Sequence, residues 1–244
     1  MERKMNRLSI INSVAQAIKA QTYIEIGVNT GEVFFSVHVR QKIAVDPHFK
    51  FSGRAKLHRI PQVRKLLYKN HEHFYEMSSD DFFAEQSELM EKFKPDLSFI
   101  DGLHTYGQTY KDVMNCLKYL SPKGVIIVHD TNPICPAFET PAVHSIQEVL
   151  DKANKGEIPG WTGNWSGDVW KAIVRLQCER EDLSIFTLDI DWGVTIITRK
   201  NNANKLSVKD IDSLNYKDLD QNRVKWLNLK KPDFLEELIQ GLTC

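Results

Sequence analysis

Two places in the sequence put a carboxylate and a histidine together directly after a short apolar run. The first contains Asp101 and His104, and the second contains His129 and Asp130. A histidine titrates near neutral pH, so either imidazole could take a proton from an acceptor hydroxyl. Two neighbouring carboxylates could instead share a divalent cation with oxygen ligands, such as Mg²⁺. The residue types therefore predict acid–base catalysis by His104, His129 and Asp101, with His104 as the first candidate for the base, or a metal held by Asp101 and Asp130.

A third group of polar residues lies earlier in the sequence. It follows the first apolar run of the chain, in a tight turn that contains two glycines. A second apolar run ends in a carboxylate about twenty residues later, the spacing at which an acid meets the hydroxyls of a ribose. A pyrophosphate cradle needs G-x-G-x-x-G, whereas this turn is acidic and lacks the third glycine. The acid suits an adenosyl cofactor whose tail carries an ammonium group, and S-adenosylmethionine is such a molecule. The candidate cofactor-binding residues here are Glu25, Gly27, Asn29, Thr30, Gly31 and Asp46.

A turn after the next predicted strand contains Ser79 and Asp80. Serine and aspartate at this position are typical of the start of a helix, where they cap backbone N–H groups. Because the turn would lie beside the strand that ends in Asp46, the two residues could also frame the adenine of the cofactor. Ser79 and Asp80 are therefore added to the candidate cofactor-binding set, together with Asp101.

Short apolar runs alternate with helical patterns along the chain, which predicts a mostly parallel sheet with helices on both faces, the Rossmann-like doubly wound α/β arrangement. The last two strands are close enough to form an antiparallel hairpin. Ligands of such sheets bind at the carboxyl ends of the strands, where the candidate residues lie. Two predicted strands end at Gly27 and at Asp46, and five more cover 73–76, 97–101, 125–129, 183–188 and 194–198. The predicted helices cover 106–120, 143–153, 168–180 and 234–242.

A segment rich in proline and tryptophan, 131–167, interrupts this alternation on the acceptor side of the sheet. Trp161 and Trp165 are candidates for a wall against the acceptor, and Trp170 follows a helical pattern typical of the core. We expect one domain over 1–200 and a helical tail over 201–244. The tail could pack as a flap or join a partner chain in a homo-oligomer.

The composition narrows the function classes. Lysine plus arginine and aspartate plus glutamate number 32 each among 244 residues, so no overall charge favours nucleic acid or a membrane surface. The basic run 54–69 is interpreted as a solvated helix face and receives no role. Neither a membrane-spanning run nor a paired cysteine motif is found, and we expect a cytoplasmic protein with reduced thiols. The cysteines are Cys116, Cys135, Cys178 and Cys244.

Taken together, these motifs resemble the class I S-adenosylmethionine-dependent methyltransferases, in particular the bacterial branch called methyltransferase family 24. The resemblance covers roughly residues 22–200. It rests on the Glu-Ile-Gly turn ending at Gly31, on Asp46, on the segment 99–106, on 122–124 leading to His-Asp-Thr at 129–131, and on 167–171.

The resemblance implies a seven-stranded sheet whose last strand is antiparallel. It places Glu25, Gly27, Asn29 and Gly31 at the methionine and ribose end of the cofactor, and Asp46 at the ribose hydroxyls. Asp101 and Asp130 match two acidic metal positions of metal-dependent O-methyltransferases, although Thr131 stands where those enzymes commonly carry asparagine, and His129 falls where some related enzymes carry an acidic ligand. Members of the family act on varied acceptors, so the resemblance implies no particular substrate. The function that we expect is O-methylation of a hydroxyl on a sugar or specialised small metabolite.

Three alternatives remain open from the sequence. A nicotinamide-dependent oxidoreductase would need NAD in place of S-adenosylmethionine. A metal-dependent hydroxylase with the same fold pattern, related to the cephalosporin hydroxylases, would need iron and a co-substrate. A non-catalytic partner would bind the cofactor without turnover and would expose apolar surface around Trp226 and Phe234.

Overall fold

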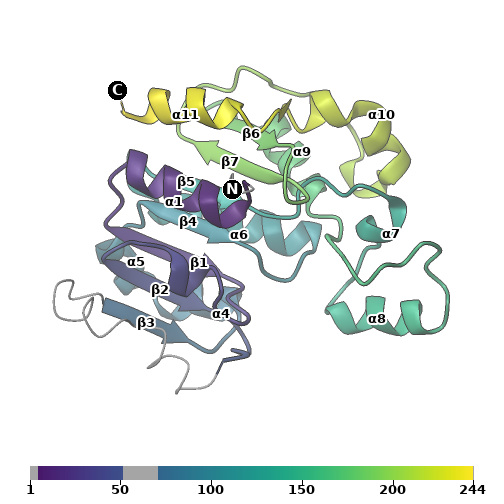
Figure 1. Ribbon diagram of the computed structural model, residues 1–244, viewed down its shortest axis with the longest axis horizontal. Helices are drawn as coiled ribbons and strands as arrows, with labels where there is room; N and C mark the ends of the chain where they lie inside the picture. The colour runs from purple at the N-terminus through teal and green to yellow at the C-terminus, as the bar shows by residue number, and fades with distance from the viewer. Residues whose placement is uncertain (1–4, 52–70, 244) are drawn as a thin grey trace. The chain divides into compact units, whose positions relative to one another are not determined.

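The computed structural model describes residues 5–51 and 71–243, and the basic run 54–69 lies outside the described residues. The chain forms two compact units. The first contains the described residues up to Gly102, the segment Asp112–Ile126 and the residues from Glu236 onward. The second contains Leu103–Lys111 and Ile127–Leu235. Figure 1 gives the element labels used below.

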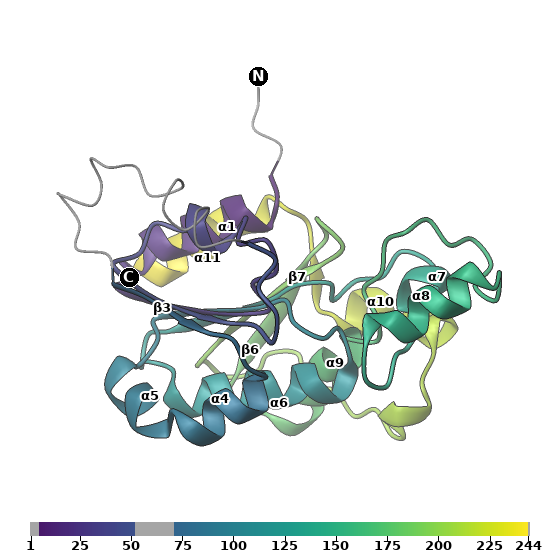
Figure 2. The ribbon, with the colours of Figure 1, turned by 90° about the horizontal axis from the view of Figure 1, so that it is seen from below.

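The first unit is built on parallel strands in the order β3-β2-β1-β4. Strands β1, β2 and β4 are almost entirely buried, as expected where helices cover both faces of a parallel sheet, whereas β3 is more exposed. Helix α1 lies on one face, and α4 and α5 lie on the other (Figure 2). The bounds are α1 Arg7–Ala17, β1 Thr22–Ile26, η1 Phe34–Ser36, β2 Gln41–Val45, β3 His71–Tyr75, α4 Ser79–Glu85, α5 Ser87–Phe93 and β4 Leu97–Ile100.

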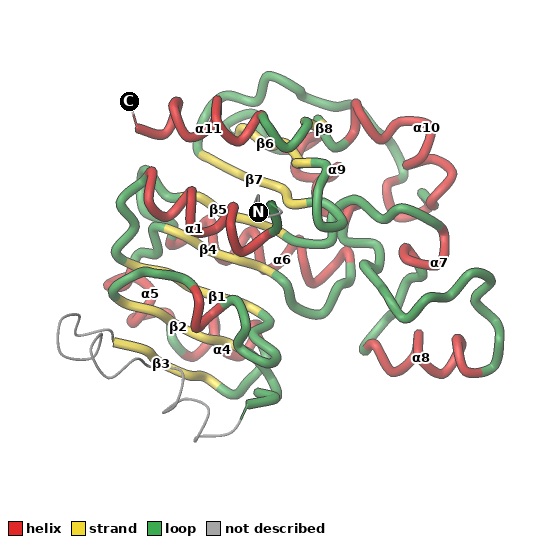
Figure 3. The backbone as a smooth tube through the Cα atoms, in the orientation of Figure 1, coloured by secondary structure: helices red, strands yellow, loops and turns green. Residues whose placement is uncertain are grey.

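The second unit contains the antiparallel hairpin of β6 and β7, with β8 added in parallel to β6. Between β5 and α9 the backbone is mostly loop, interrupted by the short helices α7 and α8 (Figure 3). The bounds are α7 Pro136–Glu139, α8 Ile146–Asn154, α9 Trp170–Glu179, β6 Ser184–Leu188, β7 Val194–Thr198, η2 Ile211–Ser213, α10 Tyr216–Trp226 and β8 Leu229–Lys230. Three elements contribute residues to both units: β5 Val125–Val128, α6 Tyr106–Tyr119 and α11 Phe234–Thr243.

The predicted fold class is confirmed. Within residues 5–51 and 71–243, the sheet has eight strands in the order β3-β2-β1-β4-β5-β7-β6-β8. Seven were predicted, and the antiparallel pairing of 184–188 with 194–198 is as expected. The eighth strand, β8, was missed because two residues are too few to carry a hydrophobic period. The sequence analysis also missed α10, a polar helix that begins with an Asn215 capping box.

The tail packs on its own chain through α10, in contact with α7, α9 and β8. The aromatic ring of Trp226 stacks on that of Trp170, which is fully buried, as the prediction of a core role for Trp170 requires. The division into a domain over 1–200 and a tail over 201–244 stays a prediction. In the part of the chain that the structure describes, no helix combines the length and apolarity needed to cross a membrane.

Candidate functional site

The turn after β1 has a backbone that permits only glycine at its first position. Gly27 has φ of 85°, a region that L side chains rarely adopt. A Cβ atom at Gly27 would also overlap the carbonyl oxygen of Asp101. The backbone of this turn therefore passes directly against the end of β4, which leaves no room for a side chain on that side.

Gly27→Ala should lower the free energy of unfolding by about 2–4 kcal/mol, because the methyl group adds a positive-φ penalty to a clash with backbone atoms that cannot rotate away. Urea denaturation measures the effect. Gly107→Ala is the matched control: Gly107 lies in α6, and a Cβ added there would meet no atom within 4 Å, so alanine should be neutral or stabilising. Equal stability of Gly27→Ala and wild type would contradict the close approach.

Asp46 ties the same turn to the end of β2. The backbone N–H of Asn29 donates to Oδ2 of Asp46 at 2.8 Å, and the N–H of His48 donates to Oδ1 at 2.8 Å. Asn29 has φ of 49°, and its carbonyl oxygen accepts from the N–H of Lys50. Asp46 is buried apart from 8% of its surface, so its carboxylate is held in one orientation. The exposed Thr30 lies in the same turn, and Gly31 closes it with φ of 74°.

Glu25 is fully enclosed in the first unit. The hydroxyl of Tyr23 donates to Oε2 of Glu25 at 2.5 Å. Burial raises the pKa of Glu25 from its ordinary value to about 8, while the hydrogen bond from Tyr23 and the charges of Lys42 and Arg7 lower it. The carboxyl group is therefore protonated at neutral pH, and it needs to lose that proton before it can form an ion pair with an ammonium group.

Glu25→Gln should remove a pH dependence of stability. The pKa of Glu25 is higher in the folded protein than in the unfolded chain, so the free energy of unfolding of wild type falls as pH rises from about 5 to about 8. Glutamine does not titrate. The free energy of unfolding of the variant should therefore rise relative to that of wild type by a few kcal/mol between about pH 5 and about pH 8, as the linkage of proton binding to folding requires. Chemical denaturation at several pH values checks this. A difference in stability between Glu25→Gln and wild type that does not change with pH would refute the raised pKa.

The turn before α4 differs in one detail from the expectation. The helix cap is Ser78, whose hydroxyl accepts from the N–H of Asp81 at 3.1 Å, so the cap lies one residue before Ser79. Asp80 and Asp81 lie in the first helical turn, where acids were expected. Ser79 is buried and Asp80 is exposed. Capping thus accounts for Ser78 and leaves the role of Ser79 and Asp80 to be tested.

Asp101 follows β4 and has a cationic neighbour that sequence reasoning missed. The Nε atom of Arg7, the first residue of α1, lies 3.9 Å from Oδ2 of Asp101. The Arg7 side chain is 28% exposed and that of Asp101 is 18% exposed. Arg7 belongs to an N-terminal helix that shows little hydrophobic periodicity, which is why no pattern singled it out.

In the second unit, His104 is oriented from two sides. Its Nδ1 lies 3.3 Å from the carbonyl oxygen of Trp165 and 3.3 Å from Oδ2 of Asp130. The imidazole ring stacks on Trp165 with centroids 5.4 Å apart. Because both neighbours of Nδ1 are acceptors, they favour the tautomer with its proton on Nδ1, which leaves Nε2 with the lone pair that a base requires. His104 has φ of 56°, and a Cβ on Gly167 would overlap its carbonyl oxygen.

His129 and Asp130 lie together in the same unit. Nδ1 of His129 is 3.2 Å from Oδ2 of Asp130, and its Nε2 is 3.7 Å from Oδ2 of Asp191. The hydroxyl of Ser166 donates to Oδ1 of Asp130 at 3.3 Å. His129 is 3% exposed, whereas the His104 side chain is 20% exposed. Asp130 therefore contacts both histidines, and His104 is the more accessible of the two.

Asp191 was not predicted by sequence, although a signal existed. It lies in the turn between β6 and β7, where Asp191, Trp192 and Gly193 all have positive φ. A glycine between two closely spaced strands is typical of a hairpin turn, but nothing in that pattern indicates which histidine the acid would approach. The hydroxyl of Thr131 lies in a buried chain of hydrogen bonds with the hydroxyls of Thr195 and Thr187, which gives Thr131 a structural role.

The tryptophans of the excursion are anchored. Nε1 of Trp165 donates to the carbonyl oxygen of Thr140 at 2.6 Å, and both Trp161 and Trp165 pack against a small apolar cluster with Val149 and Ile158. Asp168, which was also missed, accepts from the N–H of Tyr106 at the start of α6. Trp165 of the predicted acceptor wall is thus held beside His104, and contact of the wall with an acceptor stays a prediction.

The chain is similar to known proteins in part of its sequence and in its fold. The family model of methyltransferase family 24, described as a methyltransferase domain, matches residues 24–131. No curated protein matches the chain. The fold is similar to that of a candidate O-methyltransferase from Klebsiella pneumoniae, with a TM-score of 0.50, 11% identity, and coverage of 82% of this chain and 83% of that one.

An O-methyltransferase from Bacillus cereus, solved in complex with S-adenosylhomocysteine, gives a TM-score of 0.48, 11% identity, and coverage of 81% and 84%. TomG from Streptomyces achromogenes, an O-methyltransferase of tomaymycin synthesis solved with S-adenosylmethionine, gives a TM-score of 0.47 and 12% identity, with coverage of 80% of each chain. At these identities the similarity concerns the fold alone.

Proposed function

We propose that this chain, in which residues 24–131 match the family model of a methyltransferase domain, is a class I S-adenosylmethionine-dependent methyltransferase that methylates a hydroxyl oxygen of a small-molecule acceptor. The acceptor class that we propose is a sugar or a specialised metabolite. The observation that carries the proposal is the orientation of His104 by Asp130 and the carbonyl of Trp165, because hydroxyl methylation needs one base at a fixed position.

The residues around the β1 turn suit S-adenosylmethionine. The backbone at Gly27 passes flat against the end of β4, where a side chain would fill the space, and the fixed carboxylate of Asp46 suits the hydroxyls of a ribose. Glu25 would receive the ammonium group, Asn29, Thr30 and Gly31 would line the turn, and Ser79 and Asp80 would frame the adenine. Asp101 completes this proposed set.

S-adenosylmethionine, when bound, would supply a methyl group already activated by its sulfonium. The protein then has to hold the acceptor oxygen in line with the methyl carbon and remove one proton. In the proposed mechanism Nε2 of His104 would take the hydroxyl proton while the acceptor oxygen bonds to the methyl carbon, and the electrons of the S–C bond that breaks would stay on sulfur. Asp130 stabilises the imidazolium that results, since its Oδ2 lies 3.3 Å from Nδ1.

A metal on Asp101 and Asp130 is the second proposal for the same chemistry, in which Mg²⁺ would hold the acceptor hydroxyl. The contacts favour the histidine base. Asp101 already faces the guanidinium of Arg7, and Oδ2 of Asp130 faces a nitrogen of each of two histidines, whereas Mg²⁺ prefers oxygen ligands. Turnover that is lost in chelator and restored by Mg²⁺ would assign the role to the metal.

Calorimetric titration of the purified protein with S-adenosylmethionine, S-adenosylhomocysteine and NAD tests the cofactor. The proposal is supported if the protein binds the two sulfur nucleotides and does not bind NAD. Conversion of S-adenosylmethionine in the presence of hydroxylated acceptors completes the test. Binding of NAD alone would favour the oxidoreductase alternative, and cofactor binding without turnover on any acceptor would favour a non-catalytic role. Assembly into a homo-oligomer through the tail stays a prediction, which sedimentation can check.

A further inference from the structure

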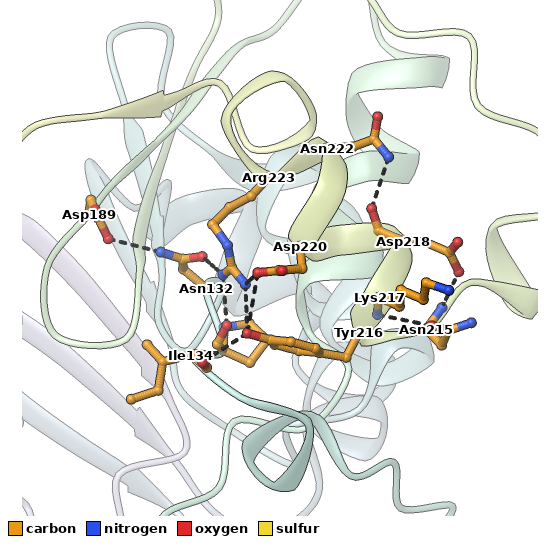
Figure 4. Close-up of polar contacts among 11 residues, drawn as sticks. Asn132, Ile134, Asp189, Asn215, Tyr216, Lys217, Asp218, Asp220, Asn222 and Arg223 are labelled. Carbon is orange, nitrogen blue, oxygen red and sulfur yellow. Dashed lines mark hydrogen bonds and ion pairs between the residues drawn. The ribbon is translucent and has the colours of Figure 1, made fainter.

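The loop that follows Asp130 is held by helix α10. Arg223 on α10 uses one guanidinium nitrogen, Nη1, to donate both to Oδ1 of Asn132 and to the carbonyl oxygen of Pro133, the latter at 2.7 Å. Figure 4 shows Arg223 pointing from the helix into this loop. The Arg223 side chain is 17% exposed, so these bonds are largely shielded from water. Arginine is suited to this contact because its planar group donates several hydrogen bonds in fixed directions.

A tyrosine on the same helix makes a second attachment. Nη2 of Arg223 donates to the hydroxyl of Tyr216 at 3.1 Å, and that hydroxyl donates to the carbonyl oxygen of Ile134 at 2.8 Å. Three consecutive residues of the loop, 132–134, are therefore bonded to α10 (Figure 4). Asp220 faces Nη2 of Arg223 at 3.2 Å, but its side chain is 61% exposed, so this ion pair contributes little.

Asn132 also connects this loop to the turn between β6 and β7. Its Nδ2 donates to Oδ1 of Asp189 at 3.0 Å, and its backbone N–H donates to the carbonyl oxygen of Trp192 at 2.8 Å. Asp191 lies between those two partners and faces Nε2 of His129 at 3.7 Å. The strand β8, which follows α10, holds the same turn from the other side, since the N–H of Asp189 donates to the carbonyl oxygen of Lys230.

The neighbouring Asp130 needs such support. It has φ of 59°, an uncommon conformation for a residue other than glycine, which persists only where the surroundings enforce it. Asp130 contacts both histidines and precedes Asn132 by two residues. A change in the 132–134 loop would therefore move the carboxylate that orients His104.

We propose that Arg223 is a positioning residue for methyl transfer: by holding Asn132 and Pro133 it sets the position of Asp130, and through Asp130 the orientation of His104. This inference rests on the proposed function for its effect on turnover. Its structural part stands independently of catalysis. It also gives the polar tail helix a function within its own chain.

The test compares Arg223→Gln and the milder Arg223→Lys and Tyr216→Phe with wild type. Two controls are matched: Arg180→Gln removes an arginine paired with Asp182 on the surface of the same unit, and Asp220→Asn removes the exposed partner of Arg223 without touching the loop. Nuclear magnetic resonance follows the imidazole shifts of His104 and His129 and the exchange of the Asn132 amide. Conversion of S-adenosylmethionine is assayed with a catechol, a flavonoid and a hexose as probe acceptors.

In Arg223→Gln we expect faster exchange of the Asn132 amide, shifted imidazole resonances and a turnover number lower by roughly tenfold to a hundredfold, the scale on which misplacement of a catalytic group acts. Affinity for S-adenosylmethionine should be unchanged. Arg223→Lys should recover part of the loss, and both controls should match wild type.

Unchanged exchange and imidazole shifts in Arg223→Gln would overturn the inference whether or not the protein is active. Faster exchange with a turnover number equal to that of Arg180→Gln would also overturn it, because the loop would then be held without serving catalysis. Failure of wild type to bind S-adenosylmethionine would count against the proposed function alone, and the resonance data would still decide the structural part.

Discussion

His104→Asn is expected to reduce the turnover number of methyl transfer by about a hundredfold or more, while affinity for S-adenosylmethionine stays within a factor of about two; general-base catalysis typically contributes at least a hundredfold. Asp130 and the carbonyl of Trp165 orient His104 through its Nδ1. Asparagine has no nitrogen that can take the hydroxyl proton, so the variant lacks the proposed base. Asparagine is the appropriate substitution because it tolerates the φ of 56° found at this position. Single-turnover kinetics with saturating cofactor measure the effect.

His144→Asn is the matched control, since His144 is an exposed histidine of the 131–167 excursion and should leave turnover at the wild-type level. His129→Gln separates the two candidate bases. If His104→Asn keeps full activity while His129→Gln loses it, His129 is the base and Asp191 becomes its orienting carboxylate. If both variants keep full activity with the true acceptor, the histidine mechanism is wrong and the metal proposal is favoured.

Asp46→Ala should weaken binding of S-adenosylmethionine by about a hundredfold. The substitution removes the proposed acceptor of the ribose hydroxyls, and it also releases the N–H groups of Asn29 and His48. Hydrogen bonds to a charged group contribute about 1.5–3 kcal/mol each, and about 1.4 kcal/mol corresponds to a tenfold change in affinity. Isothermal titration calorimetry measures the dissociation constant directly.

Asp46→Asn and Glu91→Gln complete this experiment. Asparagine keeps one carbonyl oxygen and should restore part of the affinity, whereas the exposed Glu91 should be neutral. Thermal denaturation without cofactor shows whether Asp46→Ala remains folded. A folded Asp46→Ala protein with wild-type affinity would exclude this carboxylate from the cofactor site and leave it a purely structural role in the β1 turn.

The sequence was sufficient for the elements whose residues interact with near neighbours along the chain. Strands β1, β2, β4 and β5 read as short apolar runs because both faces of a parallel sheet are buried, and α6 shows helical spacing because it buries one face. The tight turn at Gly27 was also visible in advance, since only glycine adopts its backbone conformation readily.

The contacts that define the candidate site were decided by the tertiary structure. Arg7 approaches Asp101 across more than ninety positions of sequence, and Arg223 reaches Asn132 from a helix with little apolar periodicity. The burial that raises the pKa of Glu25, and the approach of Asp191 to His129, likewise depend on the path of distant segments. Local patterns report which residues face a core, because burial repeats with the period of the helix or strand. They carry no record of which polar side chains meet, since those pairings depend on how the whole chain packs.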